Sequence, residues 1–95
     1  MKKIVLLSMI LLTTSFCEDL FELGLEAYNK GEFDKAAQQW QKACDDNVAR
    51  ACHNLGVLYE DAKGVKQDYH KAAKLYKRSC DGGFVGSCLN LGVLY

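Results

Sequence analysis

Apolar side chains recur along this 95-residue chain at steps of three and four positions, the spacing of helices with one buried face. Three sets show this spacing most clearly: Phe33, Ala36, Ala37, Trp40 and Ala43; Val48, Ala51, Cys52, Leu55, Leu58, Tyr59 and Ala62; and Tyr69, Ala72, Ala73, Tyr76 and Ser79. Stretches rich in Gly, Asn and Asp, which end helices and begin turns, separate them at Asn29–Glu32, Asp45–Asn47, Lys63–Asp68 and Asp81–Gly83. The pattern predicts five helices, near residues 19–29, 33–44, 48–61, 69–80 and 85–95.

The same pattern returns after 36 residues. The stretch "CHNLGVLY" at Cys52–Tyr59 recurs as "CLNLGVLY" at Cys88–Tyr95. Self-similarity at a period of about 20–50 residues is the signature of helical hairpins stacked in a row. We therefore expect an all-α fold, an α/α repeat solenoid, with repeats near residues 20–47 and 48–83 and an incomplete one at 84–95.

Glycine occurs inside three of these helices, each time directly after a leucine, at Gly24, Gly56 and Gly92. A glycine within a helix costs about 1 kcal/mol relative to alanine. Its return at matched positions predicts that a neighbouring helix packs closely against the backbone there.

Residues 1–17 have the layout of a secretory signal peptide: two lysines, the apolar run Ile4–Leu12, and then small polar residues. The run is too short to span a bilayer as a helix. We expect cleavage near Ser15–Cys17, which leaves residues 18–95 as a repeat domain secreted to the periplasm or the extracellular space, without a stable membrane anchor. A lipoprotein signal at Cys17 is an alternative, although no small residue precedes that cysteine. A short membrane anchor or a buried N-terminal helix is another.

Loss of that segment would leave ten basic residues against 12 acidic ones. No basic stripe remains, which argues against nucleic acid as a partner. A domain of this size has a core that is marginal by itself, so further cross-links are expected to support it.

Four cysteines outside the predicted signal peptide form two pairs with seven residues between partners, Cys44/Cys52 and Cys80/Cys88. An even number of cysteines in an oxidising compartment indicates disulfides. Eight residues along one helix rise about 12 Å, whereas bridged Cα atoms lie about 4.4–6.8 Å apart, so each pair requires a turn between its members. We predict bridges from 44 to 52 and from 80 to 88, each joining one hairpin to the next and contributing about 2.5 kcal/mol in the loop-entropy model.

Zinc binding by these cysteines is the alternative. The close C-x2-C spacing of structural zinc sites is missing, and only His53 and His70 could assist. We expect no metal and no cofactor.

The stretch "LGLEAYNKGEFDKAAQQW" at Leu23–Trp40 resembles a tetratricopeptide unit, with Leu-Gly, an aromatic pair and adjacent alanines in the expected order. The next hairpin is four residues longer between Leu55 and Ala72, which resembles the Sel-one-like repeat. With the paired cysteines and the signal peptide, the chain resembles the Helicobacter cysteine-rich proteins, a secreted Sel-one-like repeat family. This resemblance implies penicillin binding with slow hydrolysis of β-lactams, or else peptide binding or host interaction.

The sequence itself contains no catalytic constellation. A serine β-lactamase places a lysine three residues after its nucleophile. The serines Ser8, Ser15, Ser79 and Ser87 are followed at that offset by Leu11, Glu18, Gly82 and Asn90. A cysteine nucleophile needs a free thiol, which the predicted pairing removes, and His53 next to Cys52 is interpreted as a partly exposed side chain beside a bridge.

The sequence does contain residues that indicate a binding surface. In tetratricopeptide-like arrays the first helix of each hairpin lines a concave groove. Asn54 and Asn90 precede the Leu-Gly pair on such helices, and an amide can donate to and accept from a peptide backbone at once. We expect an extended peptide, a cell-wall fragment, a β-lactam or a host protein as the partner. A solvated polar position, or a contact between helices, is the alternative.

The last predicted helix, from about Val85, would leave Leu91, Leu94 and Tyr95 exposed. A repeat helix buries its apolar stripe against its own partner and the following unit. We therefore expect the sequence to be part of a longer array.

Overall fold

The computed structural model describes residues 19–94 of the chain. A first helix at residues 19–29 is followed by α2 (Phe33–Asp45), α3 (Ala49–Asp61), α4 (Tyr69–Asp81) and α5 (Val85–Leu94). Within the described range the regular structure is entirely helical. The predicted all-α fold and its five helices are confirmed, with boundaries that differ by at most one residue.

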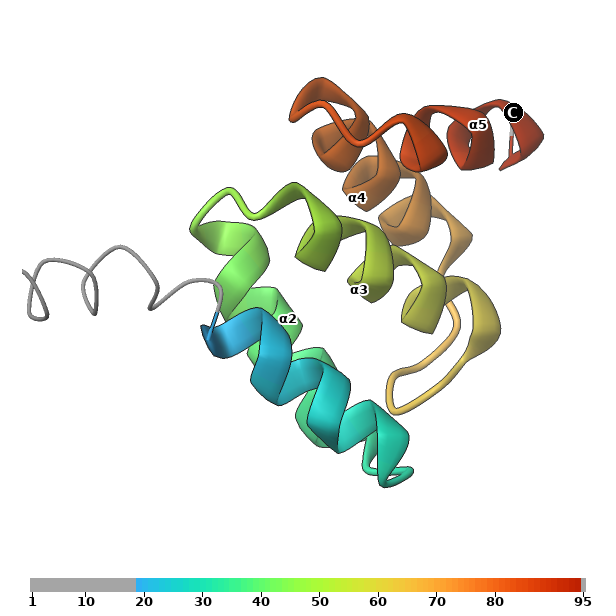
Figure 1. Ribbon diagram of the computed structural model, residues 1–95. Coiled ribbons are helices and arrows are strands. Elements are labelled where there is room, and N and C mark those ends of the chain that lie inside the picture. Colours follow the sequence, from blue (N-terminus) through green and yellow to red (C-terminus); the bar gives the residue numbers. More distant parts are fainter. Residues whose placement is uncertain (1–18, 95) are drawn as a thin grey trace, which may run out of the picture.

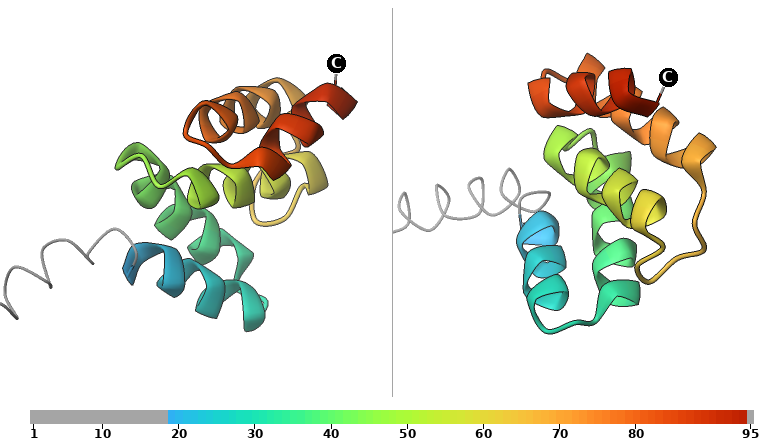
Figure 2. Two further views of the ribbon diagram at one scale, coloured as in Figure 1. Left: turned by 45° about the horizontal axis from the view of Figure 1, so that its top comes forward. Right: turned by 90° about the vertical axis from the view of Figure 1, so that its right-hand side faces the viewer.

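The helices form antiparallel hairpins that stack in two layers (Figure 1). In the right-hand view of Figure 2 the first helix, α3 and α5 form one layer, and α2 and α4 form the other. Each helix from α2 to α5 packs on the next in the chain. This is the arrangement of a repeat solenoid, in which each unit buries its apolar face against its neighbours.

The core is built from the apolar stripes that the periodicity predicts. Its most buried side chains are Ala36, Trp40, Ala43, Cys44, Ala51, Cys52, Leu55, Leu58, Ala72 and Tyr76. Many of these side chains are small, and they allow the helix backbones to approach one another. Tyr69, which the same periodicity places on the buried face, is 55% exposed instead. It is the first residue of α4, and its hydroxyl group accepts a hydrogen bond from Gln67 in the preceding loop.

Two of the three helical glycines lie against an aromatic ring of the following helix. A Cβ atom at Gly24 would overlap the indole of Trp40, and one at Gly56 would approach the ring of Tyr76 to 2.8 Å. At Gly92 a Cβ atom would meet nothing within 4 Å in the described part of the chain. The predicted close approach is therefore confirmed twice and absent at Gly92, because no described helix packs on that side of α5.

The end of the array differs from the sequence prediction in one respect. Leu91 is half-buried rather than exposed, while Val85 and Leu89 are 70% and 69% exposed. The side chains of Leu94 and Tyr95, and the whole of residues 1–18 with the predicted signal peptide and Cys17, lie outside the described residues.

Candidate functional site

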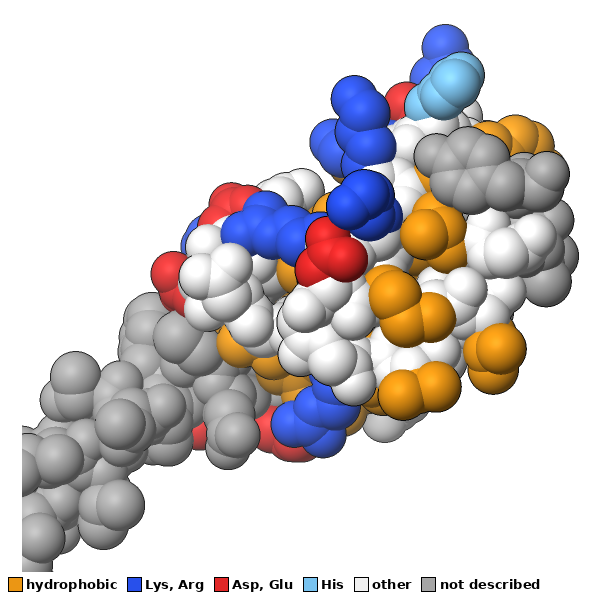
Figure 3. Space-filling model, turned by 90° about the horizontal axis from the view of Figure 1, so that it is seen from above, with side chains coloured by type: hydrophobic (Ala, Val, Ile, Leu, Met, Phe, Trp, Pro, Cys, Tyr) orange, Lys and Arg blue, Asp and Glu red, His pale blue; other side chains and the backbone are white. Residues whose placement is uncertain are grey.

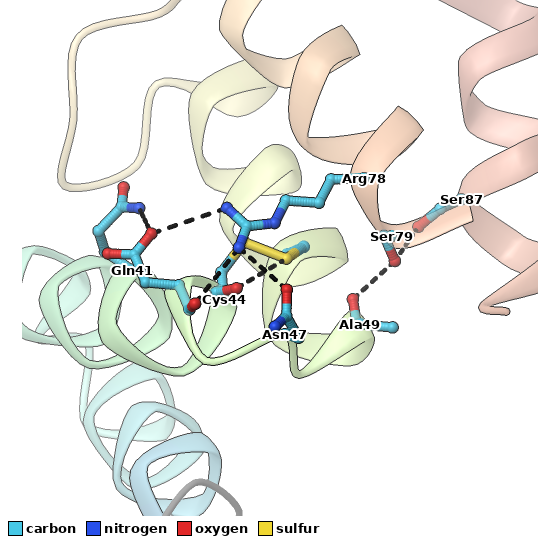
Figure 4. Close-up of a disulfide and its surroundings, with 9 residues drawn as sticks. Gln41, Cys44, Asn47, Ala49, Arg78, Ser79 and Ser87 are labelled. Atoms are coloured by element: carbon cyan, nitrogen blue, oxygen red, sulfur yellow. Dashed lines mark hydrogen bonds and ion pairs between the residues drawn. A yellow bond between two sulfur atoms is a disulfide. The ribbon is translucent and has the colours of Figure 1, made fainter. Parts of the chain in front are cut away.

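The turn between α2 and α3 reverses the chain and brings the first cysteine pair together. Asn47 adopts the left-handed backbone conformation (φ 68°), and its N–H donates to the carbonyl oxygen of Cys44 at 2.9 Å. The Cα atoms of Cys44 and Cys52 lie 4.7 Å apart and the two sulfurs are bonded. Arg78 of α4 lies across this turn and donates to the backbone oxygen of Asp45 and to Oδ1 of Asn47, at 3.3 and 3.2 Å (Figure 4).

The turn between α4 and α5 repeats this geometry. Gly83 takes the left-handed conformation there (φ 99°), and its N–H donates to the carbonyl oxygen of Cys80 at 3.0 Å. The Cα atoms of Cys80 and Cys88 are 4.8 Å apart and the sulfurs are bonded. Both bridges therefore join the end of one hairpin to the start of the next, the pairing that the spacing predicts.

A chain of hydrogen bonds runs from α3 through α4 to α5 and places a histidine against a serine. Nδ1 of His53 lies 2.6 Å from Oγ of Ser87. The Ser87 hydroxyl group donates to Oγ of Ser79 at 2.8 Å, and Ser79 donates to the carbonyl oxygen of Ala49 at 2.6 Å (Figure 4). Helical periodicity does not reveal this contact, because 34 residues separate His53 from Ser87.

The direction of this chain decides what it can do. A carbonyl oxygen only accepts hydrogen bonds, so the Ser79 hydroxyl group donates to Ala49, and the Ser87 hydroxyl group donates to Ser79. The remaining bond is then donated by the Nδ1–H group of His53, an assignment that follows from the network. His53 in this tautomer cannot take the proton of Ser87, and Ser87 is fully buried. The contact therefore joins helices and does not form an accessible nucleophile with its base.

Burial lowers the pKa of His53, and the charge of Glu60 opposes that effect. The imidazole ring packs against Tyr76 and Phe84, with ring centroids 5.5 and 4.7 Å away. Desolvation by these aromatic neighbours favours the neutral ring.

A pocket of about 160 Å³ opens between the first helix and α3. Its lining is apolar and aromatic except for one amide: Leu25, Tyr28, Trp40, Val57 and Asn54. The indole N–H of Trp40 donates to the carbonyl oxygen of Phe21 at 3.0 Å, which fixes the ring at the floor of the pocket. Apolar walls with a few placed polar groups are the usual composition of a ligand site. The structure thus places Asn54, one of the two predicted groove residues, at an apolar pocket.

Asn90, the other predicted groove residue, lies at the matched position in the next hairpin. The aromatic ring that packs on the helical glycine there is Tyr76, whose hydroxyl group donates to Oε1 of Glu60 at 2.9 Å. Burial raises the pKa of Tyr76, the hydrogen bond to Glu60 raises it further, and a hydrogen bond with Asn90 lowers it. Asn90 therefore lies in a polar cluster with Tyr76 and Glu60. The helical periodicity does not single out Glu60.

A larger cleft, of about 550 Å³, lies between the α2–α3 turn and α4 and carries three cations, Lys74, Lys77 and Arg78. Two of them are engaged: Lys77 pairs with Asp81 at 3.0 Å, and Arg78 binds the turn. Figure 3 shows lysine, arginine and carboxylate side chains next to one another on the face seen from above. The smaller pocket is the better candidate, because it combines a fixed aromatic floor with a polar anchor.

The four described cysteines are all bonded in pairs, so they supply no thiolate for a metal. Within residues 19–94 no three side chains of His, Cys, Asp or Glu come together as a metal site would require. None of the helices in this part of the chain combines the length and the apolar character needed to cross a membrane.

The helical hairpins stack in two layers, and a disulfide links the last helix of one hairpin to the first helix of the next. This architecture defines a disulfide-linked α-helical repeat protein. Comparison with known proteins agrees: residues 49–84 match the family model of the Sel1 repeat. The relatives found include three proteins of Helicobacter pylori. HcpE of strain J99 is 41% identical over 46 residues, which are 48% of this chain and 13% of that protein. HcpC of strain 26695 is 38% identical over 50 residues, 53% of this chain and 17% of that protein.

HcpA of strain J99 is 37% identical over 51 residues, 54% of this chain and 20% of that protein. HcpA is named a β-lactamase, and HcpE and HcpC carry that name provisionally. The chain therefore carries a Sel1 repeat at residues 49–84 and is similar to these Helicobacter pylori proteins over about half of its own length. Its matched part spans a fifth or less of the length of these relatives.

Proposed function

We propose that the protein binds extended peptides along the layer formed by the first helix, α3 and α5. The observation that supports this proposal is the pocket beside Trp40, which offers an apolar cavity of about 160 Å³ with Asn54 at its edge. An apolar side chain of the peptide enters the pocket, and the Asn54 amide donates to and accepts from the peptide backbone. Burial of one such side chain contributes about 1.5–3 kcal/mol.

The pocket has a built-in probe, because Trp40 is the only tryptophan of the chain. We expect a capped peptide that carries one leucine among serines to change the Trp40 fluorescence in a saturable way. The same peptide with alanine in place of leucine should bind more weakly. Asn54→Ala should weaken binding by about fivefold, the scale of one hydrogen bond.

The matched control for that experiment is Asn29→Ala, since Asn29 is exposed at the end of the first helix. It should leave binding unchanged. An unchanged Trp40 emission at millimolar peptide, or equal binding of the leucine and alanine peptides, would contradict the proposal.

A second candidate function is the binding and slow hydrolysis of β-lactams, or the binding of related cell-wall fragments. It is favoured by the name of HcpA. A chromogenic cephalosporin tests it directly. Saturable turnover by the folded wild-type chain would support an enzyme, and turnover no faster than in buffer would exclude one.

We also propose that the protein is secreted, to the periplasm or beyond the cell, where a host protein is a further possible partner. Two disulfides in a chain of this size support this proposal, because disulfides persist in oxidising compartments. Cell fractionation with an antibody against the repeat domain checks it, and recovery from the cytoplasm with free thiols would contradict it.

A further inference from the structure

The two hairpins present different chemistry at matched positions of the layer formed by the first helix, α3 and α5. Tyr28 stands five residues after Leu23 and closes the Trp40 pocket. Glu60 stands five residues after Leu55, at the corresponding point of the next hairpin. An aromatic wall in the first unit is therefore replaced by a carboxylate in the second.

The Glu60 carboxylate is held by a hydrogen bond and forms no ion pair with another described residue. It is half-buried, and its Oε1 atom accepts the hydrogen bond from the fully buried Tyr76. Asp61 follows it directly, but its side chain is exposed, so water screens its charge more strongly than that of Glu60. Among residues 19–94, the ion pairs involve other carboxylates, and neither Glu60 nor Asp61 pairs with a lysine or an arginine.

We propose that this second subsite, formed by Glu60, Tyr76 and Asn90, selects a cationic side chain of the bound peptide. The proposal rests on the proposed function and specifies its ligand: an extended peptide with an apolar side chain in the Trp40 pocket and a lysine or arginine at Glu60. A fixed, half-buried carboxylate attracts a cation more strongly than an exposed one does, because water screens it less.

The geometry also sets the distance between the two peptide side chains. Six residues of α3 separate Asn54 from Glu60, which corresponds to about 9 Å along the helix axis. The two subsites lie on either side of α3, which adds a helix spacing of about 8–10 Å across the groove. An extended peptide advances about 3.3 Å per residue, so the two side chains should lie about four residues apart, on the same side of the strand.

Three capped serine heptapeptides test the proposal, each with leucine at its second position and with lysine, glutamine or glutamate at its sixth. Binding is measured by Trp40 fluorescence and by calorimetry at low and at physiological salt. We expect the lysine peptide to bind about fivefold more tightly than the glutamine peptide, and the glutamate peptide to bind least. The preference should shrink as salt is added.

The Glu60→Gln variant should bind all three peptides alike, since its amide oxygen still accepts from Tyr76 while its charge is gone. Asp46→Asn is the matched control, because it removes one exposed carboxylate from the α2–α3 turn and should preserve the preference. Circular dichroism verifies that both variants are folded.

Equal binding of the lysine and glutamine peptides by the wild-type chain would overturn the charge preference while leaving leucine-dependent binding, and hence the proposed function, intact. A preference that survives in Glu60→Gln would also overturn it. Loss of leucine dependence in every peptide would instead overturn the proposed function and this inference with it.

Discussion

The two disulfide-linked turns have the same backbone geometry and different surroundings. At the α2–α3 turn, Cys44 and Cys52 are 0% and 1% exposed. At the α4–α5 turn, Cys80 is half-buried and Cys88 is exposed. The first bridge is covered by α4, whose Arg78 binds the turn, while nothing in the described part of the chain covers the second in this way. The turn thus determines whether a bridge can form, and the next hairpin determines whether it is buried.

The neighbours of the bridges differ as well. The first turn is packed by Ala43 and Ala51, and the second carries Ser79 and Ser87 at the positions 36 residues later, all four without exposure. The alanines form part of an apolar core, and the serines carry the hydrogen-bond chain to His53. The same turn geometry therefore tolerates two kinds of buried side chain beside the bridge, either apolar alanines or serines whose hydroxyl groups are hydrogen-bonded.

The largest expected effect comes from removing the bridges separately. Cys44→Ala with Cys52→Ala should lower the free energy of unfolding by about 3–5 kcal/mol, because the loss of the cross-link is joined by a cavity in the core. Cys80→Ala with Cys88→Ala should cost about 2.5 kcal/mol, the cross-link alone. Urea unfolding followed by circular dichroism measures both, and equal losses would show that burial does not distinguish the two turns.

The matched glycines should separate the covered and uncovered helices next. Gly56→Ala brings a Cβ atom to 2.8 Å from the Tyr76 ring and should cost about 1–3 kcal/mol. Gly92→Ala meets no described atom and should stabilise α5 by up to about 1 kcal/mol. Thermal unfolding of the two variants gives the comparison, and a stabilising Gly56→Ala would contradict the packing described for Tyr76.

Exchanging alanine and serine at the matched buried positions of the two turns should destabilise the protein in both cases. Ser87→Ala leaves the Nδ1–H group of His53 and Oγ of Ser79 without their partner, at a cost of about 1–2 kcal/mol. Ala51→Ser, the reverse change at the matched position, buries a hydroxyl group in an apolar site and should cost a similar amount. A neutral Ser87→Ala in urea unfolding would mean that the hydrogen-bond chain adds nothing to stability.

The smallest effect is a pH dependence due to His53, which contacts Ser87 of α5. The folded protein lowers the pKa of His53 below its usual value of 6.5, so the unfolded chain binds more protons as the pH falls below 6.5. Stability should therefore decrease as the pH falls from 6.5 towards the lowered pKa, by less than about 1 kcal/mol for a half-exposed group. Hydrogen exchange of α5 amides at pH 7.5 and 5.5 measures this decrease. His53→Phe should abolish the part due to His53, and an unchanged profile in that variant would assign it to other groups.

What the sequence predicts correctly is local or repeated. The helix boundaries follow from residues that act on their own neighbours, such as Asp68, whose side chain accepts from the N–H of Lys71 at the start of α4. The bridges follow from cysteine spacing and from turn residues such as Asn47 and Gly83. Comparing the repeats also predicts the close packing of a neighbouring helix at Gly24 and Gly56, because a glycine returns at the matched position.

What the sequence does not reveal depends on contacts between distant hairpins. Neither His53 nor Ser87 is unusual in its own helix, and only folding brings them to 2.6 Å. From the sequence alone Glu60 is interpreted as a solvated helix residue, and only the structure shows that its carboxylate accepts a hydrogen bond from Tyr76. Trp40 is predicted as core and is 2% exposed, yet it also lines a pocket, and helical periodicity does not predict this second role.

The short covalent loops also have a mechanical consequence. A bridge between residues eight apart removes the seven residues inside it from the load-bearing path when the chain is stretched from its ends. Eight extended residues would reach about 26–29 Å, whereas the bridged Cα atoms are held 4.7 and 4.8 Å apart. Each bridge therefore shortens the fully extended polypeptide chain by about 20–25 Å. A tensile force would unfold and extend the helices on either side, while the two turns would stay compact because the disulfides close them.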